Sequence, residues 1–493
     1  MLAALGALMG PQWSPFPMSD PLQVQSSATA IGGAPAAHVY PVTQRVVTVQ
    51  LDGATVRAQI SEPVGVSGPV AAVVFVHGAG TGSFEEAFTA QARALAASGV
   101  VTMVPDKRLD TYSLRHRDYE QMADDYEASV AYLRTQDGVD PARVGVYAES
   151  EGAWIAPVMV ARDPGIAFLL LISAPVVPPR QQAAFATDSY LRNTGAPSGL
   201  FRAIPRAVGM SLPGGGFEYA DFDVSSYQRQ VRVPVFVAYG TADASMPMVQ
   251  GAEQIIRDTA IAGNSDYTIR YYAGASHGLR VDDAIVPDFL RDMTGWVGGL
   301  PGTAHAYPRI AGEQPQQLYW ATPVPTPRWL GDGARLLLAV EVAAGLVALA
   351  GLGWLVRTGV RRVRRPPSTP GPAGAPGRPG PRGGAGRRAA ALGWLALLTV
   401  GALVFYLVAV ARLALGYERN VWIVQGGWVA VRLLGIAAVV AGVSLVDRVR
   451  SARAAHEPAA VGPGAVVFVW ANVLGGVVLL VVLAYWGVYQ LGI

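Results

Sequence analysis

The sequence predicts an α/β domain followed by an all-helical membrane region. Between about residues 45 and 300, apolar strand-like runs alternate with helical stretches, as in a mostly parallel sheet covered by helices on both faces. Four apolar stretches, each long enough to cross a bilayer, follow in the last third of the chain. At 493 residues with a net charge of +3, the chain is long enough for two or three structural units.

The α/β domain begins with a predicted hairpin over 45–63, because Asp52 and Gly53 form a dipeptide typical of tight turns. Helical spacing predicts helices over 85–99 and 118–136. Continuous apolar runs predict six further, buried strands, at 70–80, 100–106, 143–150, 167–175, 233–240 and 267–274.

Three of these strands end on residue types that carry acyl-transfer chemistry. Ser150 closes the run at 143–150, while Asp243 and His277 follow the last two strands. A lone serine is usually a turn former, and a lone loop histidine is usually a surface or packing residue. Together, however, a nucleophile, an acid and a base at strand ends, in the order Ser, Asp, His, match the triad order of α/β-hydrolases.

The stretch VGVYAESEGAWIAP (144–157) predicts how Ser150 is presented. A serine hydroxyl is a weak nucleophile until a base removes its proton, and a sharp strand-to-helix turn would aim it at such a base. Small residues must flank the serine there. Gly152 meets this need two residues after it, and Ala148 stands two residues before it, where the usual pattern has glycine.

Several motifs together resemble bacterial serine hydrolases of the α/β-hydrolase superfamily, in the branch of esterases, dienelactone hydrolases and serine-aminopeptidase-like enzymes. The resemblance covers about 45–300 and is specific for the fold and the triad but not for the substrate. In relatives the DKR motif is commonly followed by a glycine-rich turn, whereas LDTYS (109–113) stands here. The motifs are HGAG (77–80), PDKR (105–108), DPARVGVYAESEGAWIAP (140–157), LLLISAP (169–175), GTAD (240–243) and SHG (276–278).

The resemblance implies a role for each matching residue. Ser150 is expected to attack an acyl carbonyl, His277 to act as general base and then acid, and Asp243 to fix the imidazole tautomer. The oxyanion hole is expected to consist of the Glu151 amide and an amide of Gly78 or Ala79.

Neighbouring residues have expected supporting roles. The Glu151 side chain is expected to begin the following helix, where its charge suits the helix dipole, and a catalytic role for it or for Glu149 is the weaker interpretation. His77 is expected to support the oxyanion loop. A glycosidase-type carboxylate pair would leave His277 and Asp243 without a role.

Two classes of function therefore remain open. The first is a hydrolase acting on an ester, thioester or amide, with acyl transfer to an alcohol as a variant that uses the same triad. The second is a non-catalytic hydrolase-fold module that binds a partner. No metal-ligand cluster, phosphate loop or dinucleotide fingerprint occurs in the sequence, so we expect neither a metal nor a cofactor.

Residues 176–232 are too many for a simple crossover and predict a small, mostly helical lid over the serine. Its aromatic side chains are candidates for an apolar acyl pocket, with packing of the lid onto the body as an equally good explanation. These candidates are Phe185, Tyr190, Phe201, Phe217, Tyr219 and Phe222.

The membrane domain is predicted over 336–493, with spans at 336–356, 390–412, 421–446 and 465–490. The loop 357–388 is rich in Arg, Pro and Gly and is predicted to be disordered. Because this loop and the third loop are basic, the positive-inside rule places both in the cytoplasm. The α/β domain, predicted at 41–300, is then extracytoplasmic.

The remaining segments follow from this topology. Residues 1–40 are expected to hold a degraded or truncated export signal, because the apolar run LAALGALMG (2–10) is short. Residues 301–335 predict a Pro-rich juxtamembrane connector. The expected partners are an acyl substrate and the lipid bilayer. The arginine cluster at 357–388 indicates topology and not nucleic-acid binding, and the sequence predicts no oligomeric state.

Overall fold

The computed structural model describes residues 1–11, 13–80, 82–212, 216–363, 384–416, 418–456, 458, 460 and 462–490, and these residues form two compact units. Ser14–Ser189 and Gly216–Pro323 form one, which we call the sheet unit. Met1–Trp13, Tyr190–Gly215 and Val324–Ile493 form the other, which we call the helical unit.

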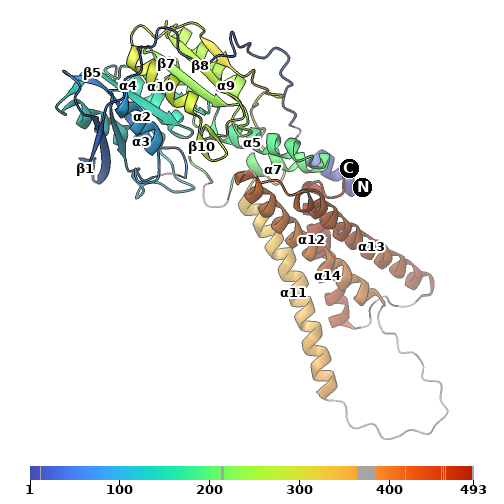
Figure 1. The fold of residues 1–493 in the computed structure, drawn as a ribbon. Helices are drawn as coiled ribbons and strands as arrows, with labels where there is room; N and C mark the ends of the chain where they lie inside the picture. The colour runs from blue at the N-terminus through green and yellow to red at the C-terminus, as the bar shows by residue number, and fades with distance from the viewer. Residues whose placement is uncertain are drawn as a thin grey trace. The chain divides into compact units, whose positions relative to one another are not determined.

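The sheet unit is built on a nine-stranded sheet in the order β1-β2-β4-β3-β5-β6-β7-β8-β11 (Figure 1). β2 pairs antiparallel with both β1 and β4, and the other neighbours pair in parallel. This topology confirms the predicted α/β-hydrolase fold. The strands are β1 (Val42–Gln50), β2 (Thr55–Pro63), β3 (Val70–Val76), β4 (Val101–Pro105), β5 (Val139–Glu149), β6 (Leu169–Ile172), β7 (Val235–Gly240), β8 (Tyr267–Tyr272) and β11 (Ile310–Gly312).

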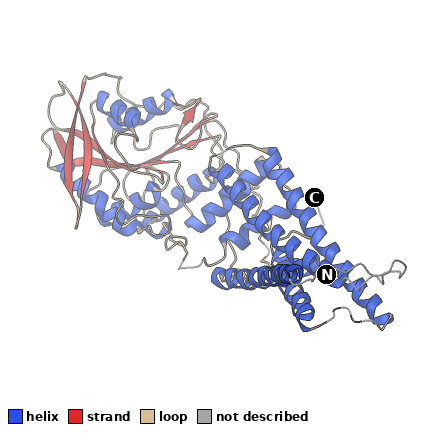
Figure 2. Ribbon diagram, turned by 90° about the horizontal axis from the view of Figure 1, so that it is seen from below, coloured by secondary structure: helices blue, strands red, loops and turns tan. Residues whose placement is uncertain are grey.

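Helices cover both faces of the sheet (Figure 2). Along β3, Val74 and Val76 belong to one hydrophobic core, whereas Val73 and Phe75 belong to the other, so neither face can be left in water. The first core includes side chains of α3 (Tyr119–Arg134), α4 (Gly152–Arg162) and α9 (Met248–Ile261). The second includes side chains of α2 (Thr89–Ala97) and α10 (Pro287–Gly299).

The sheet unit extends beyond the range 41–300 at both ends. After α10 the chain adds β11, which pairs in parallel with β8, so part of the expected connector is sheet. Before β1, the amide of Gln25 donates to Ile310 O and its side chain accepts from the amide of Arg309. Smaller elements of the chain are α5 (Pro179–Asn193), α6 (Ser198–Phe201), α7 (Ala203–Val208), α8 (Ser225–Gln228), β9 (Arg280–Val281) and β10 (Ala284–Ile285).

The helical unit contains four helices that are long and apolar enough to cross a membrane. The first and second extend past the predicted spans, so 357–363 and 384–388 are helical, and the rest of the loop predicted as disordered lies outside the described residues. The elements are α1 (Leu2–Met9), α11 (Gly333–Val363), α12 (Gly384–Leu415), the π-turn η1 (Trp422–Gly426), α13 (Gly427–Ala454) and α14 (Pro463–Tyr485).

The predicted lid is divided between the two units. Residues 190–215 group with the long apolar helices, and we call this segment the insertion. Within the helical unit, Tyr190 donates its hydroxyl to Glu418 O at 2.9 Å, and Gln425 donates to Gly195 O at 3.0 Å. Arg206, which is 1% exposed, donates to Gly6 O at 3.0 Å and lies over the ring of Tyr485. The insertion therefore completes the helical unit.

Candidate active site

Ser150 lies on a sharp turn between the end of β5 and the start of α4. Its φ of 55° is in the left-handed region, which costs free energy for a residue with a Cβ and is common at nucleophilic serines. A Cβ on Gly152 would lie 2.6 Å from Val76 O, so only glycine fits where helix and strand meet. The expected strand–turn–helix geometry is present, and Ala148 is fully buried under it.

His277 and Asp243 come from the loops after β8 and β7. His277 Nδ1 lies 2.8 Å from Asp243 Oδ2, and Ser245, two residues further along the same loop, donates its hydroxyl to Asp243 Oδ1 at 2.6 Å. Asp243 is thus buried but fully hydrogen-bonded. The contact assigns the Nδ1 proton of neutral His277 to the Asp243 side, which leaves Nε2 as the basic nitrogen.

The electrostatics of this pair follow from the same contact. Burial by itself would lower the pKa of His277, but the charge and hydrogen bond of Asp243 raise it above its usual value. For Asp243 the directions are reversed. Burial by itself would raise its pKa, but His277 and the hydrogen bonds from Ser245 lower the pKa below its usual value. Each group therefore favours the charged form of the other.

The end of β6 brings the serine and histidine loops together. The amide of Ser150 donates to Ile172 O at 2.9 Å, and the hydroxyl of Ser173 donates to the carbonyl oxygen of His277 at 2.5 Å. Ile172 and Ser173 are consecutive, so both loops are fixed to one short piece of backbone. The three predicted catalytic residues therefore share the carboxyl edge of the parallel sheet, where such folds bind ligands.

The glycine loop after β3 lies against the serine turn. A Cβ on Gly78 would come within 3.2 Å of both Glu149 O and Ser150 Cβ, so the backbone of Gly78 approaches Ser150 closely. His77 is buried, and its Nε2 lies 2.7 Å from Pro105 O. Burial lowers the pKa of His77 to about 4, so the ring is neutral near pH 7. Its contact with Pro105 O connects this loop to the end of β4.

The two glutamates beside Ser150 have different surroundings. Glu149 accepts from the hydroxyl of Tyr147 at 3.1 Å, and burial raises its pKa. The Glu151 carboxylate is 1% exposed and binds Lys107 at 3.0 Å and Arg117 at 2.6 Å. Glu151 is the N-cap residue of α4, as expected, and its side chain forms these ion pairs instead of a capping hydrogen bond.

The six aromatic side chains predicted to line a pocket do not form one group. Tyr190 and Phe201 belong to the helical unit, and Phe201 packs against the guanidinium of Arg192. The other four belong to the sheet unit: Phe185 is buried in its core, Phe217 is exposed, Tyr219 donates to Leu114 O at 3.0 Å, and Phe222 packs on Tyr119. That these six side chains line an acyl pocket stays a prediction.

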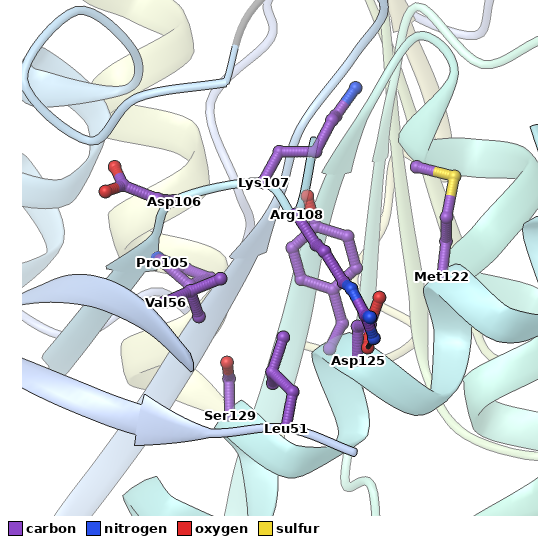
Figure 3. A pocket seen from close by; sticks show the side chains of 10 residues that line it. Leu51, Val56, Pro105, Asp106, Lys107, Arg108, Met122, Asp125 and Ser129 are labelled. Atoms are coloured by element: carbon purple, nitrogen blue, oxygen red, sulfur yellow. Dashed lines mark hydrogen bonds and ion pairs between the residues drawn. The ribbon is translucent and has the colours of Figure 1, made fainter. Parts of the chain in front are cut away.

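A small cavity lies near the end of β4, and Lys107 stands at its rim (Figure 3). In Figure 3 the Lys107 side chain extends away from Leu51 and Ser129 on the opposite wall. None of the predicted catalytic residues lines this cavity. The lining residues are Leu51, Val56, Pro105, Asp106, Lys107, Arg108, Met122, Asp125, Tyr126 and Ser129.

Several residues that the structure places at the site were not predicted from sequence patterns. Lys107 belongs to the PDKR motif, but no spacing rule connects it with Glu151, which lies 44 positions further along the chain. Ser245 follows the GTAD motif without a pattern of its own, and Ser173 lies within the predicted strand 167–175. A cation directly after a buried strand is the one signal that could have drawn attention to Lys107.

Several solved structures are similar to about half of this chain at low sequence identity. No protein-family model and no curated protein matches the sequence. A hyperthermophilic esterase from the archaeon Pyrobaculum calidifontis is 20% identical, with a TM-score of 0.40, over 52% of this chain and 84% of that one. A dienelactone hydrolase from Anabaena variabilis is 16% identical, with a TM-score of 0.37, over 52% of this chain and 96% of that one. By its own strand order and serine turn, the sheet unit has the α/β-hydrolase fold, and the chain continues into four helices that could span a membrane.

Proposed function

We propose that this protein is a membrane-anchored serine hydrolase that cleaves an acyl ester, thioester or amide through Ser150, His277 and Asp243. The observation that carries the proposal is the 2.8 Å contact between His277 Nδ1 and Asp243, with Ser150 on a left-handed turn held by the adjacent end of β6. This arrangement supplies the nucleophile, the base and the group that orients the base.

The reaction follows from these roles. Ser150 Oγ attacks the acyl carbonyl carbon while its proton moves to His277 Nε2, and Asp243 stabilises the resulting imidazolium. Backbone amides of Glu151 and of the loop at Gly78 and Ala79 bind the oxyanion of the tetrahedral intermediate. His277 then protonates the leaving group, and water releases the acyl group from Ser150 by the same steps in reverse order.

A fluorophosphonate probe tests this function without knowledge of the substrate. An activated serine displaces fluoride from phosphorus and keeps the phosphonyl group, so the site of the adduct identifies the nucleophile. We expect one adduct on the full-length protein in detergent, mapped by peptide mass spectrometry to Ser150. Heat-denatured protein is the control and should not react. An adduct on another serine, or none, would contradict the proposal.

The arrangement of the helical unit supports an extracytoplasmic catalytic domain. The insertion contacts the starts of α11 and α13 and the ends of α12 and α14. Ser211 hydrogen-bonds to Gly331 and Gly333 at the start of α11. The other contacts are with Glu418 after α12, with Gln425 before α13 and with Gly487 after α14. The opposite helix ends are richer in arginine and include Arg357, Arg387, Arg388, Arg448 and Arg453, whereas the insertion end has fewer, such as Arg335, Arg412 and Arg419. By the positive-inside rule, the insertion end faces away from the cytoplasm.

Because the chain contains no cysteine, single introduced cysteines can test this topology directly. Arg419→Cys places an exposed thiol at the insertion end, and Ser451→Cys places one near the end of α13. We expect a membrane-impermeant maleimide to label Arg419→Cys on intact cells, and Ser451→Cys only after permeabilisation. The cysteine-free parent is the background control. The reverse labelling pattern would place the catalytic domain in the cytoplasm.

A further inference from the structure

A buried charge cluster surrounds the carboxylate of Glu151, the residue directly after the nucleophile. Oε2 accepts from Lys107 Nζ and from the hydroxyl of Tyr112, each at 3.0 Å. Oε1 accepts from Arg117 Nη1 at 2.6 Å and from the hydroxyl of Tyr119 at 3.4 Å. Each carboxylate oxygen thus has one cation and one phenol, which satisfies a charge that would otherwise be costly to bury.

Lys107 connects this cluster with the glycine loop. Its side chain is 2% exposed, and Nζ donates to Gly78 O at 2.6 Å as well as to Glu151. Burial lowers the pKa of Lys107, and the charge of Glu151 opposes that effect. One ammonium group therefore bridges the two residues whose backbones flank Ser150, since Gly78 approaches Ser150 on one side and Glu151 follows it in the chain.

The direction of the Gly78 carbonyl determines which amide of the loop can serve as a donor. The C=O of Gly78 and the N–H of Ala79 belong to the same planar peptide unit, and in a trans peptide they point in opposite directions. Because the oxygen is held toward Lys107, the Ala79 N–H points away from Lys107. Lys107 thus fixes the orientation of a backbone donor that it does not itself touch.

We propose that the buried Lys107–Glu151 ion pair positions the groups of the oxyanion hole. The ion pair orients the Ala79 amide as a donor and fixes the distance between that amide and the Glu151 amide. The inference rests on the proposed function, because it assigns a role only if Ser150 is the nucleophile. Lys107 and the Glu151 carboxylate are positioning residues, whereas the two amides contact the reacting oxygen.

The charge of the cluster adds to its geometric effect. Of the two cations, Lys107 contacts the glycine loop, whereas Arg117 contacts Glu151. A cation at the carbonyl oxygen of Gly78 also polarises that peptide and strengthens its N–H as a donor. Preorganised dipoles of this kind stabilise a developing oxyanion most where water is excluded.

Aromatic rings hold the two cations in place. Lys107 Nζ lies 4.5 Å from the ring centre of Tyr112, and the Arg117 guanidinium lies 5.1 Å from Tyr112 and 4.7 Å from Tyr219. Tyr112 belongs to LDTYS, the segment that departs from the glycine-rich turn of relatives. This departure places a phenol on the Glu151 carboxylate.

The test compares two single-cation deletions on the full-length protein in detergent. Lys107→Met removes the contact with Gly78 O and leaves Glu151 paired with Arg117, whereas Arg117→Met removes a cation from Glu151 without touching the glycine loop. We expect the second-order rate of fluorophosphonate labelling to fall by about 10- to 100-fold in Lys107→Met, since loss of one oxyanion donor costs about 100- to 1,000-fold. In Arg117→Met the rate should fall much less than in Lys107→Met, because Arg117 contacts Glu151 but does not bond the glycine loop.

Two further readouts separate positioning from general stability. Affinity for a trifluoromethyl ketone, which forms an anionic hemiketal with the serine, should fall in parallel with the labelling rate in Lys107→Met. Lys107→Gln can still donate to Gly78 O, so its labelling rate and inhibitor affinity should lie between those of Lys107→Met and wild type. If Lys107→Met does not fold, Lys107→Gln replaces it in the test.

The outcomes also separate this inference from the function on which it rests. If wild type labels at Ser150 and both deletions label equally fast, or are slowed equally, the positioning role is overturned. If wild type does not label, or labels at another serine, the proposed function itself fails.

Discussion

Replacing Ser150 by alanine is expected to lower kcat for p-nitrophenyl esters by about a million-fold, the loss typical of removing a triad nucleophile. Without Oγ there is no acyl-enzyme, and His277 and Asp243 have no proton to relay. The variant should fold normally, because the left-handed turn is held by the backbone bond to Ile172 and by Gly152. The measurement is steady-state hydrolysis by the purified full-length protein, with melting temperature recorded alongside.

Ser276→Ala is the matched control for that experiment. Ser276 is exposed and directly precedes His277, so its loss removes a hydroxyl near the site but none from the proposed relay. Its kcat should stay close to that of wild type. A Ser150→Ala protein that folds and keeps more than a small fraction of wild-type turnover would mean that another group attacks the ester.

Replacing Asp243 by asparagine should lower kcat by about ten thousand-fold at neutral pH, as expected when the orienting carboxylate of a triad becomes an amide. The side-chain amide N–H of the introduced asparagine can donate a hydrogen bond to Nδ1. This favours the imidazole tautomer with its proton on Nε2, where the nitrogen can no longer accept the proton of Ser150. The substitution also removes the negative charge that raises the pKa of His277.

The pH profile of Asp243→Asn gives a second, independent result. In wild type, activity requires neutral His277, so kcat/KM should fall as the pH drops through the His277 pKa, which lies above its usual value. With the Asp243 charge gone, the lowering effect of burial has less opposition, and the acid limb should move to lower pH. Asp282→Asn, an exposed carboxyl, should leave the limb unchanged. An unmoved limb in Asp243→Asn would mean that the limb reports another group.

The framework of the site was predictable because its signals are local. Buried parallel strands appear as continuous apolar runs, and a Ser between small residues at the end of such a run predicts a sharp turn. Parallel strands align their carboxyl ends at one edge, so Ser150, Asp243 and His277 could be placed together from strand ends alone. The Asp-Gly turn between β1 and β2 has the same local character.

Other features depend on contacts that no local pattern reveals. Glu151 looked like a helix-starting carboxylate, but Lys107 and Arg117 reach it from another loop. The aromatic residues between β6 and β7 could be picked out by composition, but the division of that segment between the two units depends on contacts of the folded chain. The three-residue strand β11 is too short to give a periodic signal.

Arg206 has a consequence for how the protein is made. Its guanidinium bonds Gly6 of α1 and lies over the ring of Tyr485 at the end of α14, so segments far apart in the sequence meet at one side chain. During synthesis, the insertion therefore lacks one of its neighbours until α14 has been made. A chain interrupted before α14 would leave this buried arginine without its aromatic partner.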